Sequence, residues 1–157
     1  MESCIINSPL GFTRVIGDED GISSVTILNS EETVTDIIPV ELEDCVIQLN
    51  EYFEGSREVF DLKLNVQGTD FQKRVWKQLD QIPYGKTLSY LELSKQLGDV
   101  KAIRAVAQAN GRNPLLIIIP CHRVIGSDGS LTGYAGGLHR KKWLLEHESP
   151  YKQQSLF

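Results

Sequence analysis

The 157-residue sequence has little cysteine, histidine or methionine, and it has no long hydrophobic run. Its three cysteines, Cys4, Cys45 and Cys121, are too few to form a disulfide framework. The longest apolar run, residues 115–119, is far shorter than the ~20 residues of a membrane-spanning helix. We therefore expect no signal peptide, no membrane association and a reducing, cytoplasmic location.

Metal ligands are also scarce in the first part of the chain. The three histidines all lie at position 122 or later, so residues 1–67 offer only Cys4 and Cys45 as cysteine or histidine ligands. A structural zinc site needs four ligands, which are usually cysteine or histidine. We expect Cys45 to be a core residue, and we expect no metal ion. No cofactor-binding motif is visible.

Charge divides the chain into two contrasting parts. Residues 1–67 hold 3 basic and 14 acidic side chains, a balance of −11, whereas residues 68–157 hold 13 and 7, a balance of +6. The overall charge of −5 hides this division. We expect only the second part to contact a polyanion such as DNA. Chance segregation of solvated charge is the alternative.

The first part is predicted to be a small α/β domain, residues 1–67. Residues 12–17 and 22–28 favour two strands around the turn-rich segment 18–21, and residues 41–53 have helical periodicity. Residues 60–66 alternate apolar and polar side chains, which is typical of a half-buried strand.

The second part, residues 68–150, is predicted to be mostly helical. Thr69 with Gln72, and Ser89 with Glu92, have the spacing of capping boxes that open two helices. Gly98 follows the second helix, and a third helix is expected at about 100–110. Helix, glycine-containing turn and helix form a helix-turn-helix pattern. Residues 151–157 are a polar tail.

The most informative segment is residues 120–124, Pro-Cys-His-Arg-Val, which follow the apolar run 115–119. We expect that run to be a buried strand that presents Cys121 and His122 at its end. Because the thiolate is the nucleophile, a reactive cysteine needs a base or a cation nearby, and His122 and Arg123 are adjacent. A buried, inert cysteine is the alternative.

This motif resembles the active site of the O6-alkylguanine-DNA alkyltransferases, and the resemblance runs from about Asp70 to Glu148. It implies a ribonuclease-H-like N-terminal α/β domain and a winged-helix or helix-turn-helix DNA-binding domain. It also implies direct transfer of an alkyl group, such as methyl, from O6 of guanine to Cys121, with O4 of thymine as another target. A duplex containing O6-alkylguanine is then the partner, and a monomer is expected.

The resemblance implies roles for particular residues. His122, acting through a water molecule, removes the thiol proton, and Glu148, in a segment similar to the family's closing helix, orients His122. Tyr90 faces the flipped nucleotide, and Asn113 braces the active-site loop. Arg104 matches the family's arginine finger on a recognition helix lying in the DNA minor groove. Further substrate or DNA contacts are expected from Lys101, Ala105, Gln108, Arg123, Val124, Tyr134 and Ala135. Ala102 and Ala109 are also expected to let the helix approach the groove.

Base extrusion is chemically required, because a thiol cannot reach the O6 substituent of a stacked guanine. The thioether product has no good leaving group, which predicts one turnover per molecule. A non-enzymatic lesion-binding protein of the same fold is one alternative, and the presence of Cys121 argues against it. A Cys-His hydrolase is another, but it would not need a basic helix-turn-helix.

The C-terminal residues, from Gln153 to Phe157, read Gln-Gln-Ser-Leu-Phe. They resemble the short peptide by which bacterial proteins bind the replication sliding clamp. Two apolar residues on a polar tail gain nothing in water, which favours a binding role. A tail that packs on its own domain is the alternative.

Overall fold

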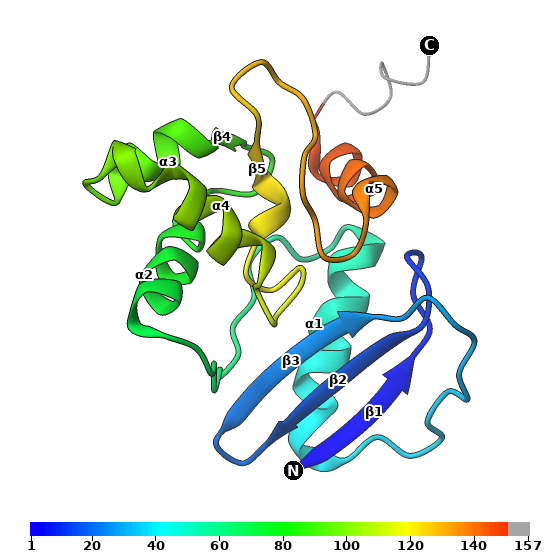
Figure 1. Cartoon of the computed structure of the whole chain (residues 1–157). Helices are drawn as coiled ribbons and strands as arrows, with labels where there is room; N and C mark the ends of the chain where they lie inside the picture. The colour runs from blue at the N-terminus through cyan, green and yellow to red at the C-terminus, as the bar shows by residue number, and fades with distance from the viewer. Residues whose placement is uncertain (151–157) are drawn as a thin grey trace. The chain divides into compact units, whose positions relative to one another are not determined.

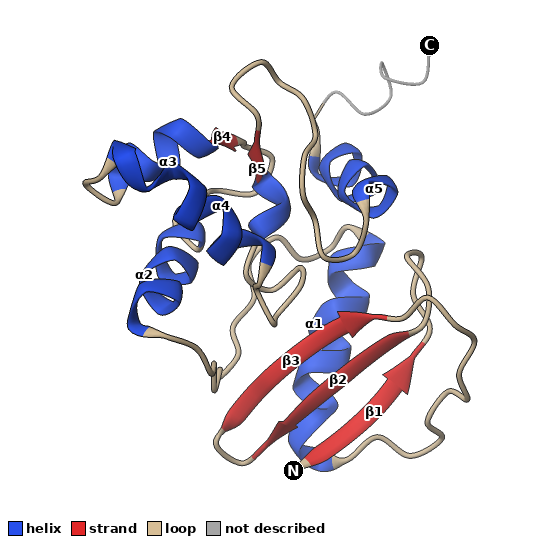
Figure 2. Ribbon diagram, viewed as in Figure 1, coloured by secondary structure: helices blue, strands red, loops and turns tan. Residues whose placement is uncertain are grey.

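The structure is a computed structural model that describes residues 1–150, so the tail motif at 153–157 lies outside the described residues. The chain forms two compact units. The first contains Met1–Gln67 together with Pro114–Ile118, and the second contains Gly68–Asn113 and the chain from Ile119 onward. Figure 2 shows the three-stranded sheet in the first unit and most of the helices in the second.

The first unit is an antiparallel sheet in the order β1-β2-β3 with α1 across one of its faces (Figure 1). Cys4 pairs with Val15, and Val15 pairs with Val25, and all three side chains are buried. On the helix, Cys45 and Leu49 are fully buried. The elements are β1 (Glu2–Ile6), β2 (Thr13–Asp18), β3 (Gly21–Ile27), the 3-10 helix η1 (Val40–Leu42) and α1 (Glu43–Glu54).

The predicted hairpin and the helix at 41–53 are confirmed, but the strand predicted at 60–66 is wrong. Residues 60–64 do alternate between half-buried and exposed, as the pattern indicates, but residues 65 and 66 are both half-buried. The backbone, however, makes only an isolated parallel bridge, between Ile22 and Leu64, through two hydrogen bonds of 2.9 and 2.8 Å. Alternation of apolar and polar residues indicates that one face of the segment is buried. It does not require continuous backbone pairing with a neighbouring strand.

Two helices of the second unit begin where the sequence predicted. Thr69 and Ser89 each form a complete capping box, with Gln72 and Glu92 respectively. Asp99 caps the 3-10 turn that leads into α4. The elements are α2 (Asp70–Leu79), β4 (Leu88–Ser89), α3 (Tyr90–Gln96), η2 (Val100–Ala102), α4 (Ile103–Gly111), η3 (Cys121–Arg123), β5 (Val124–Ile125) and α5 (Leu138–Glu148).

The buried strand predicted at 115–119 is also wrong. Only Leu115 makes a bridge, to Val25, and the residues after it form turns. Ile117 has φ of 75°, and the Ile118 N–H donates to the Leu116 carbonyl at 2.9 Å across it, which is a strained three-residue turn. The run is apolar because every one of its side chains is buried, although it is not a strand.

Within residues 1–150, the structure has no helix of the length and apolar character that crossing a membrane requires.

The first unit gives a test of backbone packing at Gly21. Gly21 has φ of +132°, and a Cβ there would lie 2.8 Å from the backbone carbonyl carbon of Leu64. Gly55 has φ of +89°, but a Cβ there would meet nothing within 4 Å. We expect Gly55→Ala to cost about 1 kcal/mol of unfolding free energy, through backbone strain alone. Gly21→Ala should cost about 2–4 kcal/mol, because the backbone at Leu64 must also move.

Urea denaturation of the two variants and of the parent chain measures both costs. Equal losses in the two variants would contradict the close approach at Gly21.

Candidate active site

Cys121 lies in the first turn of η3, where the backbone reverses sharply. Pro120 has φ of −81° and ψ of 61°, and the Cys121 N–H donates to the Ile119 carbonyl at 2.8 Å, which makes an inverse γ-turn. The Cys121 side chain is a free thiol and is almost fully buried. Proline fixes φ in this range, so the turn sets the direction of the thiol.

The structure brings His122 and Glu148 together. His122 Nε2 lies 2.7 Å from Glu148 Oε2, and both side chains are buried. Arg123 contacts the same carboxylate through Nε at 2.8 Å and Nη2 at 3.0 Å, while its Nη1 donates to the Ile82 carbonyl at 2.7 Å. Arg123 therefore donates to both oxygens of Glu148, and His122 contacts one of them.

This arrangement corrects the role expected for Arg123. From the sequence, we expect Arg123 to be among the groups that contact the substrate or DNA. Instead, its guanidinium is buried, is fully engaged with Glu148 and Ile82, and lies 5.7 Å from the centre of the Tyr84 ring. Bidentate pairing with a carboxylate is the geometry that arginine supplies best. Arg123 is therefore a support for Glu148.

The electrostatics keep the resting site uncharged at sulfur and at imidazole. Burial raises the pKa of Cys121 to about 11, against the opposing effects of the Asn113 hydrogen bond and the Lys141 charge. Burial also lowers the pKa of His122 despite its contact with Glu148. For Glu148, burial alone would raise the pKa, but the hydrogen bonds from His122 and Arg123 hold it well below its ordinary value.

These directions fix the histidine tautomer. An ionised Glu148 only accepts hydrogen bonds, so a neutral His122 carries its proton on Nε2 and leaves a lone pair on Nδ1. His122 Nδ1 is buried and has no hydrogen-bond partner among residues 1–150. A neutral thiol on Cys121, followed in the chain by a histidine with an unprotonated Nδ1, has the protonation states of a nucleophile and its base at rest.

Two asparagines near the end of α4 contact residues 119–123, which we call the reactive loop. Asn113 Nδ2 donates to the Ile119 carbonyl at 2.7 Å, and its side chain also hydrogen-bonds to the Cys121 sulfur. Asn110 Nδ2 donates to the Cys121 carbonyl at 3.4 Å. Trp76 Nε1 donates to the Ala109 carbonyl at 2.8 Å and so fixes this end of the helix to α2.

Lys141 on α5 is fully buried, which is rare for lysine. Its Nζ donates to the Thr132 carbonyl at 2.7 Å and lies 5.8 Å from the centre of the Tyr90 ring. Among the residues that the structure describes, no carboxylate forms an ion pair with it. Burial lowers its pKa to about 8, and the Cys121 charge would raise it. When Cys121 is ionised, its thiolate is the negative charge that stabilises this buried ammonium group.

Tyr90 and Tyr134 border the loop between β5 and α5. The Tyr90 hydroxyl donates to the Thr132 carbonyl at 3.0 Å, the same oxygen that Lys141 uses. The Tyr134 hydroxyl is buried without a hydrogen-bond partner among residues 1–150, and burial raises its pKa well above the ordinary value. Ala135 is exposed, whereas Val124 is fully buried and pairs with Leu88 in the short parallel ladder of β4 and β5.

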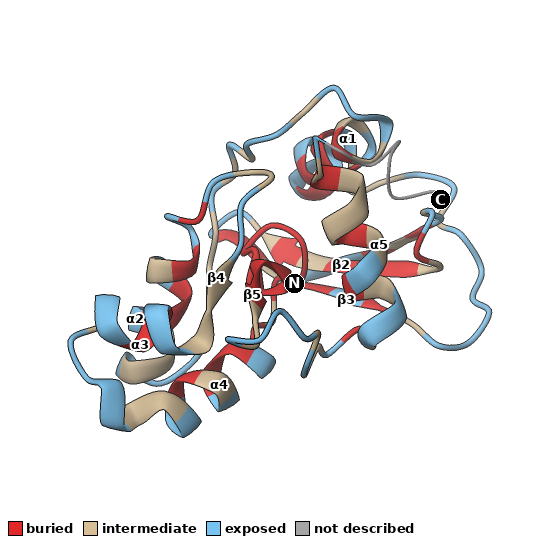
Figure 3. Ribbon diagram, turned by 90° about the horizontal axis from the view of Figure 1, so that it is seen from above, coloured by how far each residue is buried: buried red, intermediate tan, exposed pale blue. Residues whose placement is uncertain are grey.

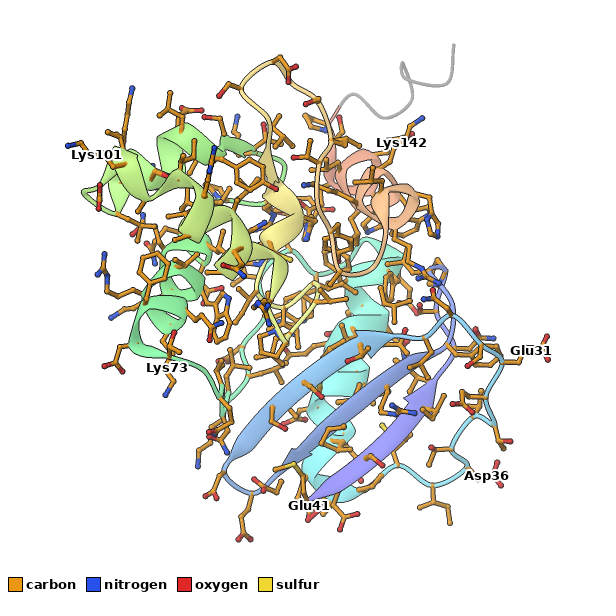
Figure 4. The ribbon with its side chains drawn as sticks, in the orientation of Figure 1. Glu31, Asp36, Glu41, Lys73, Lys101 and Lys142 are labelled. Carbon is orange, nitrogen blue, oxygen red and sulfur yellow. The ribbon has the colours of Figure 1, made fainter. Side chains whose placement is uncertain are left out.

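The exposed side of η2 and α4 carries the residues predicted to meet DNA. Lys101, Arg104, Ala105 and Gln108 are all exposed, and α4 in Figure 3 has exposed and buried residues on different sides. The expectation that Ala109 lies on this side is wrong, because Ala109 is buried beside Val106. Figure 4 shows Lys101 and Lys73 of the second unit extending into solvent, and it labels Glu31, Asp36 and Glu41 among the acidic residues of the first.

Sequence reasoning missed Lys141 and Asn110, although each had a local signal. Lys141 falls on the stripe of α5 that contains Leu144 and Glu148, at spacings of three and four, so it shares their buried face. Asn110 lies four residues after the buried Val106. Neither charge nor amide was expected on a packing face. Among residues 1–150 no group of three or more His, Cys, Asp or Glu side chains is arranged to hold a metal ion.

Comparisons with known proteins cover both units. Residues 3–66 match the family model described as 6-O-methylguanine DNA methyltransferase, ribonuclease-like domain, and residues 70–150 match the model of its DNA binding domain. A methylated-DNA–protein-cysteine methyltransferase of Methanosarcina barkeri is 48% identical over 151 residues, covering 92% of this chain and 94% of the relative. One from Mycobacterium tuberculosis is 47% identical over 147 residues, with 91% and 89% covered.

Solved structures agree with the sequence matches. The structure of Mycobacterium tuberculosis OGT in complex with DNA has a TM-score of 0.84 and 45% identity, with 97% of each chain covered. An O6-methylguanine DNA methyltransferase from Methanococcus jannaschii has a TM-score of 0.69 and 31% identity, with 93% of each chain covered. This chain belongs to the methylated-DNA–protein-cysteine methyltransferase family.

Proposed function

We propose that this chain repairs alkylated double-stranded DNA by moving the alkyl group, methyl above all, from O6 of guanine to Cys121 Sγ. The observation that carries the proposal is the buried Cys121 thiol next to a His122 whose Nε2 is fixed on Glu148. That relay lies in the same unit as a helix-turn-helix with an exposed basic side. Family membership supports the same activity.

In the proposed reaction one bond to carbon replaces another. The Cys121 sulfur attacks the alkyl carbon, the bond between that carbon and O6 breaks, and a thioether forms. The thiol proton passes through a water molecule to His122 Nδ1, and the resulting imidazolium is stabilised by the Glu148 carboxylate. The departing guanine carries the electron pair of the broken bond and takes up a proton to become neutral. The thioether is stable, so each molecule reacts once.

DNA binding is assigned to the exposed side of η2 and α4. We propose that Lys101 and Gln108 contact the DNA backbone, that Ala105 lets the helix approach the minor groove, and that Arg104 fills the gap left by the flipped nucleotide. Extrusion of the nucleotide costs a few kcal/mol, and less for a poorly paired lesion, which favours damaged sites. Phosphate and minor-groove contacts carry little sequence code, so any sequence context should be accepted.

The flipped base is assigned to the loop between β5 and α5. Tyr134 supplies an aromatic wall, the backbone at Ala135 reaches O6, and the Val124 carbonyl accepts from the exocyclic amine. Tyr90 then leaves the Thr132 carbonyl and donates to N3 of the guanine, where negative charge develops. A thymine alkylated at O4 presents a similar alkoxy group, and we propose it as a second substrate.

The reaction is tested by intact mass after incubation with a duplex that contains one O6-methylguanine. We expect a gain of about 14 Da, because one hydrogen on sulfur is replaced by a methyl group. The gain should saturate at one per protein and be absent in Cys121→Ser. Lesion binding without any mass gain would contradict methyl transfer and favour a lesion-binding protein instead.

Lys141 gives a second test, in which stability and activity change in opposite directions. We expect Lys141→Met to raise the unfolding free energy by about 1–3 kcal/mol at pH 7, because an unpaired buried cation is replaced by an apolar chain of similar size. The same change should slow methyl transfer about tenfold, since a cation that favours the thiolate is lost.

The pH dependence of this stability gain has a defined sign. The pKa of Lys141 is about 8 in the folded chain and 10.5 for the free side chain. Below pH 8 the buried ammonium destabilises the parent fully, and from pH 8 to 10.5 the folded chain sheds the proton first and recovers stability. The gain should therefore be constant below pH 8 and shrink above it. Denaturation curves at pH 7 and pH 9.5 measure this, and a less stable variant at pH 7 would refute the assignment.

We also propose a monomer in the cytoplasm that binds the replication sliding clamp through residues 153–157. A reducing compartment supports this location because it keeps the Cys121 thiol available. Deleting residues 153–157 should abolish binding to an immobilised clamp while leaving the rate of methyl transfer unchanged. A double substitution, Leu156→Ala with Phe157→Ala, should match the deletion. Unchanged affinity for the clamp in both the deletion and the double variant would contradict clamp binding through these residues.

A further inference from the structure

Asn110 is a buried amide that the proposed reaction does not use. It is 1% exposed and lies in the last turn of α4. Its Nδ2 donates to the Cys121 carbonyl at 3.4 Å, and its Oδ1 is buried with no hydrogen-bond partner among residues 1–150. A buried polar group that lacks a partner lowers stability. The half-satisfied amide therefore needs an explanation other than stability.

The position of Asn110 supplies that explanation. The same short helix exposes Arg104 and Gln108 on one side and directs the Asn110 amide to the backbone of the reacting residue on the other. The end of α4 is itself fixed by the bond from Trp76 Nε1 to the Ala109 carbonyl. Asn113, beyond the helix, holds the Ile119 carbonyl. The reactive loop is thus held by side-chain amides at two of its carbonyls.

The contact with Asn110 differs from that with Asn113 in what it controls. Asn113 bonds to the residue before Pro120 and to the sulfur, so it acts on the thiol itself. Asn110 donates to the backbone carbonyl of Cys121 itself, and the Val124 N–H donates to the same oxygen. Together they fix the plane of the peptide between Cys121 and His122, which sets the direction of both side chains.

We propose that Asn110 is a positioning residue that ties the Cys121–His122 peptide to α4, so that docking of the helix on DNA places the nucleophile against the flipped base. This inference rests on the proposed function. The bond is long in the free protein, which is common for contacts that tighten in the reactive complex. Asn110 contacts neither the base nor the alkyl group.

The test is single-turnover methyl transfer by Asn110→Leu, followed by intact mass at increasing concentrations of a duplex with one O6-methylguanine. Leucine has a similar size and makes no hydrogen bond. We expect the limiting rate to fall about fivefold, the loss expected from one uncharged hydrogen bond. The half-saturating duplex concentration and the final stoichiometry of one methyl per protein should not change. The midpoint of thermal unfolding should not fall, because an unsatisfied buried amide has been removed.

Ser94→Ala is the matched control. Ser94 is also buried, and its hydroxyl donates to the Tyr90 carbonyl within α3 and not to a carbonyl of residues 119–123. We expect this variant to keep the parent's limiting rate and half-saturation. Asn110→Ala serves as a second variant if leucine does not fit, and the same loss of rate at full stoichiometry is expected.

Two results would overturn the inference. One is an unchanged limiting rate in both Asn110 variants. The other is a lower stoichiometry with a lower unfolding midpoint, which would mean that Asn110 only supports the fold. Failure of the parent chain itself to gain a methyl group would instead refute the proposed function, so the two failures are distinguishable.

Discussion

The buried carboxylate of Glu148 is the interaction on which the rest of the site depends. It stands at the end of α5 and receives His122 Nε2 on one oxygen and Arg123 on both. Because an isolated buried carboxylate is very costly, its two partners must be in place for α5 to pack at all. Arg123 in turn holds the Ile82 carbonyl, which links the turn after α2 to the same cluster. One charge therefore fixes the histidine tautomer and the relation between η3 and α5.

The charge balance among Cys121, His122, Arg123, Lys141 and Glu148 explains how a buried thiol is unreactive at rest and can still become a nucleophile. Arg123 and Lys141 are cationic, Glu148 is anionic, and His122 and Cys121 are neutral at rest, because burial raises the pKa of the thiol and lowers that of the imidazole. The cluster thus has an excess of one positive charge. Thiolate formation, or the negative charge that develops on a departing guanine, neutralises it. Burial protects the thiol from solvent electrophiles, and the excess cation favours the anionic transition state.

Sequence alone predicted the parts whose causes are local. Thr69 with Gln72, and Ser89 with Glu92, mark helix starts by side-chain bonds over three residues, and the structure has both boxes. The predictions of strands at 60–66 and 115–119 were wrong, because a pattern of apolar residues indicates only which side chains are buried. A strand also needs a neighbouring strand to pair with along its length, and each segment makes only an isolated bridge. His122 and Glu148 are 26 residues apart, so only the family resemblance suggested their pairing. Lys141 and Asn110 were missed because a polar residue on a packing face carries meaning only once its neighbours in space are known.

The polar groups left unsatisfied at this site follow from its chemistry. Among residues 1–150, the buried side-chain atoms without a partner are Asn110 Oδ1, His122 Nδ1 and Tyr134 Oη. Each belongs to a residue at or beside the reactive loop, and each lowers the stability of the resting protein. An enzyme that turns over many times must recover its resting state after each reaction. A protein that reacts once need only reach the transition state once, so it tolerates an incompletely hydrogen-bonded resting site that the substrate completes.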